Sequence, residues 1–233
     1  MILSCKQIEQ YLENGYLLVP GLIPSDIVEC AEAKMWQELG VHSNEPETWK
    51  NANWETWSLI SPEIRACYTP EFLTAAMQLG EGEPDPEIYR PRKRHSVLPI
   101  FPQEGEWRHH GAHIDHSIKS HSEKTFPFAF RLAAMAYLND VEPHSGGTVV
   151  WPGSHRKIEA LARSNPTYYE YMWSLGSDLH KVDIGEPIEL TPNQGDVLFY
   201  HYLCAHSGSQ NVGRRPRFAV NTKWERDVSR HGR

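Results

Sequence analysis

The sequence lacks the features of several large classes of protein. No apolar run reaches the roughly 18 residues that a membrane-spanning helix needs, so we expect no membrane segment. Basic residues do not dominate, because 23 Lys and Arg stand against 30 Asp and Glu, a formal net charge of −7. Nucleic-acid-binding domains usually carry a basic excess, so we expect no nucleic-acid partner. The chain also has no internal repeat and no low-complexity segment.

Cysteine is scarce, and the first residues carry no targeting signal. The four cysteines are far apart and form no Cys-x-x-Cys pair, which indicates reduced thiols rather than a disulfide framework or a zinc site. The N-terminal residues lack both a basic segment and a long apolar segment, so we expect no signal peptide and a cytoplasmic protein. A length of 233 residues fits one domain, residues 1–233.

The sequence divides into a helical front, residues 1–95, and a strand-rich body, residues 96–233. In the front, Ser4 and Ser25 are expected to cap two helices that end near Gly15 and Gly40. Helical spacing recurs over residues 158–175, with a break at Pro166. Strands are expected at residues 16–20, 96–101, 129–138, 148–151, 182–184, 187–190, 197–200 and 218–224. Short strands between regular turns predict a mainly β fold, a barrel or jelly roll with flanking helices.

Two histidines and an aspartate form a candidate metal site. His113 and Asp115 are two residues apart, and residues two apart on a strand point to the same face. A third ligand must come from another strand, and His206 follows the strand expected at 197–200. Two histidines and one carboxylate are the facial ligand set of non-haem iron(II). A His-x-Asp triplet alone is a weak signal, since a solvated or hydrogen-bonded pair gives the same pattern.

An arginine follows the last candidate ligand. Arg217 lies eleven residues after His206 and enters an apolar strand, unlike Arg214 and Arg215, which fit a solvated turn. Its guanidinium can bind a carboxylate with two hydrogen bonds and stays charged at any working pH. The sequence therefore predicts a site for an acidic cosubstrate. Further candidate contacts, for which a structural role is the alternative, are Ser207, Ser209, Tyr137 and Arg131.

Four stretches together resemble the phytanoyl-CoA dioxygenase family. They are residues 15–24, the triplet His113–Asp115, residues 140–156 with a Gly-Gly turn and a Pro-Gly-Ser-His segment, and residues 195–211 with Arg217. The resemblance implies a double-stranded β-helix of the cupin-like, jelly-roll type. It also implies iron(II) bound by His113, Asp115 and His206, with 2-oxoglutarate on Arg217 and O2 as the oxidant.

The resemblance further implies hydroxylation of a small organic molecule, with release of succinate and CO2. Related halogenases carry a small residue in place of the ligand carboxylate, so Asp115 favours hydroxylation. Two alternatives stay open: desaturation or rearrangement by the same type of oxygenase, and a non-catalytic cupin-like metal-binding module. Residues 41–94 match no stretch of the family, so we expect substrate contacts there. Its tryptophans, Trp49, Trp54 and Trp57, fit either a lid or a packed layer. No oligomeric state is predicted.

Overall fold

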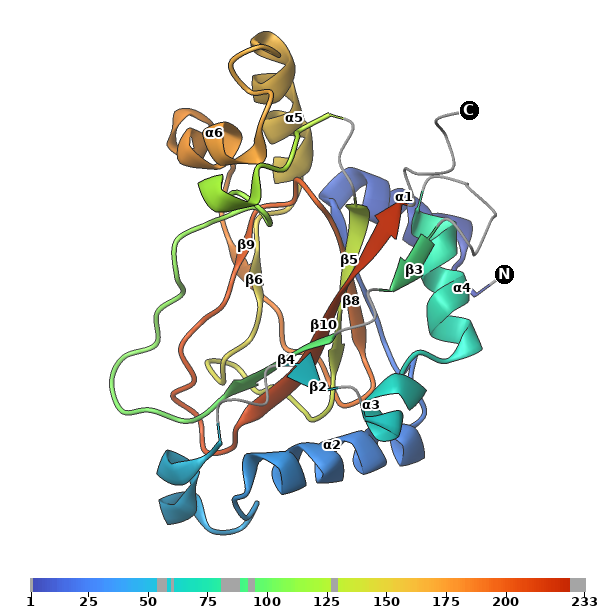
Figure 1. The fold of residues 1–233 in the computed structure, drawn as a ribbon, viewed down its shortest axis with the longest axis vertical. Helices are drawn as coiled ribbons and strands as arrows, with labels where there is room; N and C mark the ends of the chain where they lie inside the picture. The colour runs from blue at the N-terminus through green and yellow to red at the C-terminus, as the bar shows by residue number, and fades with distance from the viewer. Residues whose placement is uncertain are drawn as a thin grey trace.

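Two antiparallel β-sheets form the centre of the protein (Figure 1). The computed structural model describes residues 2–53, 58–59, 61–80, 89–91, 95–126 and 130–226. The helices are α1 (Cys5–Asn14), α2 (Ser25–Leu39), η1 (Pro46–Asn51), α3 (Pro62–Ala66), α4 (Pro70–Leu79), η3 (Lys119–His121), α5 (Ser154–Ser164), α6 (Met172–Ser177) and η4 (Leu179–Lys181). The strands are β1 (Tyr16–Val19), β2 (Ser58–Leu59), β3 (Tyr89–Pro91), β4 (His95–Ile100), β5 (Phe130–Tyr137), β6 (Val149–Val150), β7 (Ile188–Glu189), β8 (Val197–His201), β9 (His206–Ser207) and β10 (Arg217–Arg226).

The larger sheet has seven strands, in the order β1-β8-β5-β10-β4-β2, with β3 also paired to β10. The smaller sheet has the order β7-β6-β9. Strand β1 comes from the N-terminal part of the chain and pairs with β8, so the front contributes a strand to the body. The mainly β, jelly-roll fold with flanking helices is confirmed. Within the described part of the chain, no helix is both long and apolar enough to cross a membrane.

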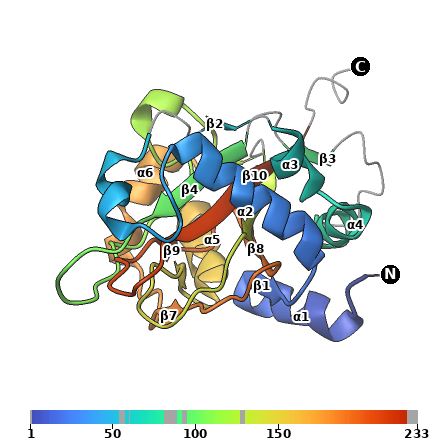
Figure 2. The same ribbon diagram turned by 90° about the horizontal axis from the view of Figure 1, so that it is seen from below.

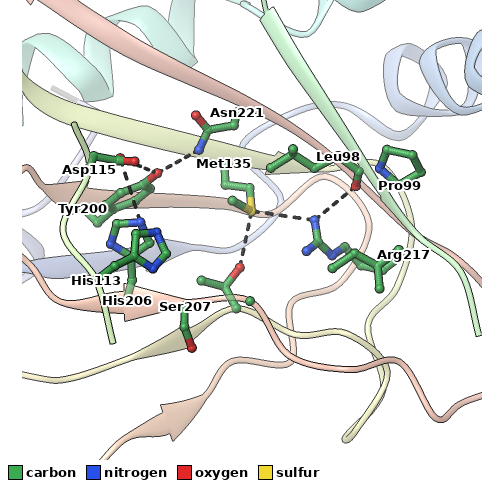
Figure 3. A pocket seen from close by; sticks show the side chains of 13 residues that line it. Leu98, Pro99, His113, Asp115, Met135, Tyr200, His206, Ser207, Arg217 and Asn221 are labelled. Atoms are coloured by element: carbon green, nitrogen blue, oxygen red, sulfur yellow. Dashed lines mark hydrogen bonds and ion pairs between the residues drawn. The ribbon is translucent and has the colours of Figure 1, made fainter. Parts of the chain in front are cut away.

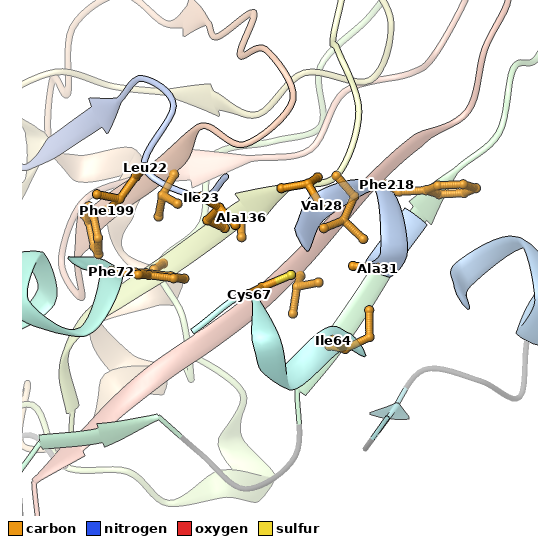
Figure 4. Packing of buried hydrophobic residues seen from close by; sticks show 14 of the residues in the cluster. Leu22, Ile23, Val28, Ala31, Ile64, Cys67, Phe72, Ala136, Phe199 and Phe218 are labelled. Atoms are coloured by element: carbon orange, nitrogen blue, oxygen red, sulfur yellow. The ribbon is translucent and has the colours of Figure 1, made fainter. Parts of the chain in front are cut away.

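The larger sheet separates two apolar cores. Along β5, Leu132, Ala134 and Ala136 face the helices, whereas Met135 and Tyr137 face the smaller sheet. Such alternation follows from the strand geometry, in which successive side chains point to opposite faces. Helices α2, α3 and α4 cover the first face, and their side chains pack against β5, β8 and β10 (Figure 4). Seen from below, α2 crosses this face of the sheet (Figure 2). The smaller sheet and the candidate site lie on the second face of the larger sheet.

The predicted helices and strands agree with the structure except at a few positions. Ser4 caps α1 as expected, and Gly15 ends it with a φ of 77°. Ser25 is the first residue of α2 rather than its cap, because Pro24 occupies the N-cap position without a side-chain hydrogen bond. The strand predicted at 182–184 is wrong: no strand forms there, and the next strand along the chain is β7. Helix α4 was not predicted, although Thr69 caps it and Pro70 stands in its first turn.

His155, at the start of α5, contacts the backbone at the C-terminal end of α1. Its Nε2 lies 3.2 Å from the carbonyl oxygen of Leu12, and Arg156 donates to the same oxygen at 2.7 Å. The imidazole ring packs directly on Gly15, so a Cβ at position 15 would overlap it. The contacts of His155 are those of a helix-end partner.

We expect Gly15→Ala to lower the free energy of unfolding by about 2–4 kcal/mol. Two costs add: a left-handed φ that alanine tolerates poorly, and a forced shift of the His155 ring. Gly21→Ala is the matched control, because Gly21 also has a positive φ, of 56°, but a Cβ there meets nothing within 4 Å. Urea unfolding of both variants separates the two costs. Equal losses for the two variants would contradict the His155 contact.

Candidate metal centre

His113, Asp115 and His206 come together at one end of a cavity between the two sheets (Figure 3). Their ligand atoms all lie within 4.8 Å of one another, and the described residues contain no other such group of three. The backbones of His113 and His206 form a mutual pair, with both N···O distances at 3.0 Å. This pair fixes two ligands that are distant in sequence. Asp115 follows in a turn, so its direction is not set by strand alternation as the sequence analysis assumed.

The hydrogen bonds of His206 leave one ring nitrogen for a metal. Its Nδ1 lies 2.9 Å from the carbonyl oxygen of Cys204, a contact that requires the proton to sit on Nδ1. The lone pair of Nε2 then faces the cavity, where Nε2 lies 3.9 Å from Oδ2 of Asp115. Metal-binding histidines commonly donate their second N–H to a carbonyl in this way. Cys204 itself is buried.

Electrostatics keep the candidate ligands in their metal-binding forms. His113 is exposed at the edge of the cavity, yet the loss of water around its ring, together with the nearby His206, lowers its pKa to about 4. Burial alone would raise the pKa of Asp115, but the nearby His206 and Lys223 outweigh burial and hold it at about 2. At neutral pH the site therefore offers a neutral imidazole and a carboxylate, as metal binding requires.

Three side chains that were not predicted from the sequence surround Asp115. The Nζ of Lys223 lies 3.0 Å from Oδ1 of Asp115. The hydroxyl of Tyr200 lies 3.4 Å from Oδ2, and Asn221 donates to that hydroxyl at 2.7 Å. A signal for two of them was available: Arg217, Asn221 and Lys223 are spaced by even numbers on one strand, so they share a face.

The cavity extends from the three ligands to Arg217 at its other end (Figure 3). Its volume is about 390 Å³, and aliphatic side chains, among them Leu98 and Met135, form the wall between the two ends. The Arg217 side chain donates to the carbonyl oxygens of Gly146 and Leu98, at 3.0 and 3.3 Å.

Arg217 is 3% exposed, and burial lowers the pKa of its guanidinium because the charged form loses water. No carboxylate of the described residues lies within ion-pair distance of it. A buried cation without a counter-ion is costly, and a bound anion removes that cost.

The other predicted contacts differ in their access to the cavity. Ser207 lines it, and its buried hydroxyl has no hydrogen-bond partner in the structure. Ser209 donates to the carbonyl oxygen of Gly147 at 2.8 Å. Tyr137 donates to Thr148, which lines the cavity, so Tyr137 stands behind it. Arg131 belongs to β5, but its side chain lies outside the described residues.

Of the three tryptophans expected to form a lid or a packed layer, the structure describes only Trp49. Trp49 is buried and packs against Trp36 and Phe101, with ring centroids 6.0 and 5.9 Å away. This placement is that of a packed helical layer. Trp54 and Trp57 lie outside the described residues, as does most of the 81–94 connection.

The donor set fits iron(II). Two imidazole nitrogens and one carboxylate oxygen, without a thiolate, leave open positions on a six-coordinate metal. The sequence also matches the phytanoyl-CoA dioxygenase (PhyH) family over residues 82–219. The chain belongs to this family. It is an oxygenase that depends on iron and 2-oxoglutarate, and the predicted family, fold and cofactors are confirmed.

Solved structures share the fold at low sequence identity. The carbocyclase SnoK from nogalamycin biosynthesis is 19% identical, with a TM-score of 0.64 over 96% of this chain and 84% of SnoK. The epimerase SnoN, in complex with Fe3+, alpha ketoglutarate and nogalamycin RO, is 18% identical, with a TM-score of 0.66 over 95% and 82%. EctD from S. alaskensis, with 2-oxoglutarate and 5-hydroxyectoine, is 19% identical, with a TM-score of 0.61 over 97% and 77%. No curated protein sequence matches the chain.

Proposed function

We propose that this oxygenase hydroxylates a small organic molecule at the cavity between its two sheets. His113, Asp115 and His206 hold iron(II), and Arg217 binds the distal carboxylate of 2-oxoglutarate, with Ser207 as a further hydroxyl donor. With iron(II) held by these residues, the site would supply the chemistry that couples the decarboxylation of 2-oxoglutarate to the oxidation of a substrate C–H bond. The observation that carries the proposal is the separation, across one cavity, of the metal ligands from a buried cation that lacks a carboxylate partner among the described residues.

The chain's own side chains prepare this site before any ligand binds. Lys223 and Tyr200 hold Asp115, while the Cys204 carbonyl holds the tautomer of His206. Arg217 is itself buried, next to an aliphatic wall that includes Leu98 and Met135. These surroundings strengthen the pairing of a carboxylate with Arg217, because the same charges attract more strongly in a medium of low dielectric constant. We assign no role in the reaction to Ser209, whose hydroxyl is already used by a backbone carbonyl.

Hydroxylation is the proposed reaction because Asp115 supplies the carboxylate ligand. Rearrangement is the second candidate, since structures with this fold include a carbocyclase and an epimerase. We also propose that residues 1–233 form one domain, supported by the pairing of β1 with β8. A cytoplasmic location is supported by four free cysteines, of which Cys5 and Cys30 are exposed.

We expect a weak visible charge-transfer band when iron(II) and 2-oxoglutarate are added to the protein without oxygen. The band requires 2-oxoglutarate to bind to the iron that the protein holds, which the cavity allows. Admission of O2 should then yield succinate, and addition of candidate small molecules should yield products heavier by one oxygen atom. Absorption spectroscopy and mass spectrometry provide the two measurements. Absence of both band and succinate would favour a non-catalytic metal-binding module, while products without added oxygen would favour rearrangement or desaturation.

A further inference from the structure

Lys223 presents a half-buried ammonium group to a candidate metal ligand. It lies on the inner face of β10, six residues after Arg217, and its side chain is 16% exposed. Its Nζ lies 3.0 Å from Oδ1 of Asp115, whose side chain is likewise 16% exposed. A lysine beside a metal site repels the incoming cation and so weakens metal binding. We therefore expect Lys223 to have a function that offsets this cost.

The two oxygens of Asp115 have different surroundings. Oδ2 lies on the side of the other ligands, 3.9 Å from Nε2 of His206, and is 3.4 Å from the Tyr200 hydroxyl. Oδ1 contacts Lys223 instead. Asp115 stands in a turn, next to His116 with a φ of 58°, so no strand pairing fixes its carboxylate. The side-chain contacts therefore determine which oxygen faces the metal position.

We propose that Lys223 is a positioning residue that occupies Oδ1 of Asp115, so that this carboxylate binds iron through Oδ2 alone. The inference rests on the proposed iron site. A carboxylate that binds through both oxygens would take an additional coordination position, and 2-oxoglutarate and O2 need the open positions of a facial triad. A charge-assisted hydrogen bond to Oδ1 opposes the rotation that would bring both oxygens to the metal. Lys223 thus keeps a position open for the cosubstrate.

Lys223→Met tests the proposal, because methionine retains a long unbranched chain and removes the ammonium group. In the variant we expect bound Mn(II) to keep about one-third fewer water molecules than in the wild type, as the second carboxylate oxygen replaces one of about three. Proton relaxation of water around bound Mn(II) counts them without any cosubstrate. We also expect at least tenfold weaker 2-oxoglutarate binding to the iron-loaded protein, with iron still bound. Lys223→Arg should restore the wild-type water count and bring the 2-oxoglutarate affinity to within about threefold of the wild type, since arginine can donate to Oδ1.

Lys181→Met is the matched control, because Lys181 forms a comparable ion pair with Asp178, at 2.8 Å, elsewhere in the fold. It should leave both measurements unchanged. Unchanged water count and 2-oxoglutarate affinity in Lys223→Met would overturn the proposal, and so would a loss of Mn(II) binding in a variant that remains folded. Failure of the proposed function would look different, since the wild type itself would then bind no iron or give no charge-transfer band.

Discussion

Replacing Asp115 by alanine is expected to abolish stoichiometric iron binding and, with it, turnover. The substitution removes the only carboxylate among the three ligands and leaves the charge of Lys223 beside the metal position without the Asp115 carboxylate. We expect the metal dissociation constant to rise by more than about 100-fold, beyond the roughly 10–100-fold range found when a group that only supports a ligand is lost. Equilibrium dialysis with iron(II) under anaerobic conditions measures the effect.

His113→Ala should behave in the same way, whereas His110→Ala provides the control. His110 lies three residues before His113 but is exposed and does not belong to the group of three ligands. The control variant should bind one iron per chain. Retention of stoichiometric iron by the Asp115→Ala protein would disprove the assignment of this residue as a ligand.

Replacing Arg217 by methionine should raise the concentration of 2-oxoglutarate needed for half-maximal rate by about 100-fold or more. Loss of one partner from a buried, hydrogen-bonded charge pair costs about 2–5 kcal/mol, and each 1.4 kcal/mol corresponds to about tenfold in affinity. Iron binding should persist, because Arg217 contacts none of the three ligands and lies at the opposite end of the cavity. Steady-state kinetics with varied 2-oxoglutarate and a separate iron titration distinguish the two effects.

Two controls belong to this experiment. Arg215→Met removes a neighbouring arginine outside that cavity, and its 2-oxoglutarate requirement should match that of the wild type. The melting temperature of Arg217→Met must also be measured, because the arginine donates to the carbonyls of Gly146 and Leu98. A folded Arg217→Met protein with normal 2-oxoglutarate dependence would place the cosubstrate carboxylate on another residue.

The metal ligands could be predicted from the sequence because their residue types are specific and their order along the chain matches a family pattern. Strand alternation, however, explains the position of only one of the two neighbouring ligands. His113 does lie in a bridge opposite His206, but Asp115 stands in a turn rather than on the same strand. Its carboxylate reaches the site through contacts with Lys223 and Tyr200, which are distant in sequence. Side-chain networks of this kind are set by tertiary packing and leave little trace in local patterns.

Errors in the predicted elements also have physical causes. Val182–Ile184 has the residues of a strand, but among the described strands only β6 pairs with β7, and these three residues find no partner. Strands need a neighbour to satisfy their backbone groups, and sequence alone does not supply it. Helix α4 went unpredicted although Thr69 and Pro70 are a clear start signal, since the surrounding residues showed little periodicity.

Strand β10 limits the ways in which this protein can diversify. One face of the strand carries Arg217, Asn221 and Lys223, and the other packs Phe218 and Trp224 beneath the helices. A one-residue insertion or deletion within the strand would exchange the two faces, placing charges in the apolar core and rings in the cavity. Changes of length between Arg217 and Lys223 are therefore costly, while single substitutions on the cavity face leave the core intact. New substrates are more readily accommodated through the loops around the cavity, whose lengths can change without moving β10.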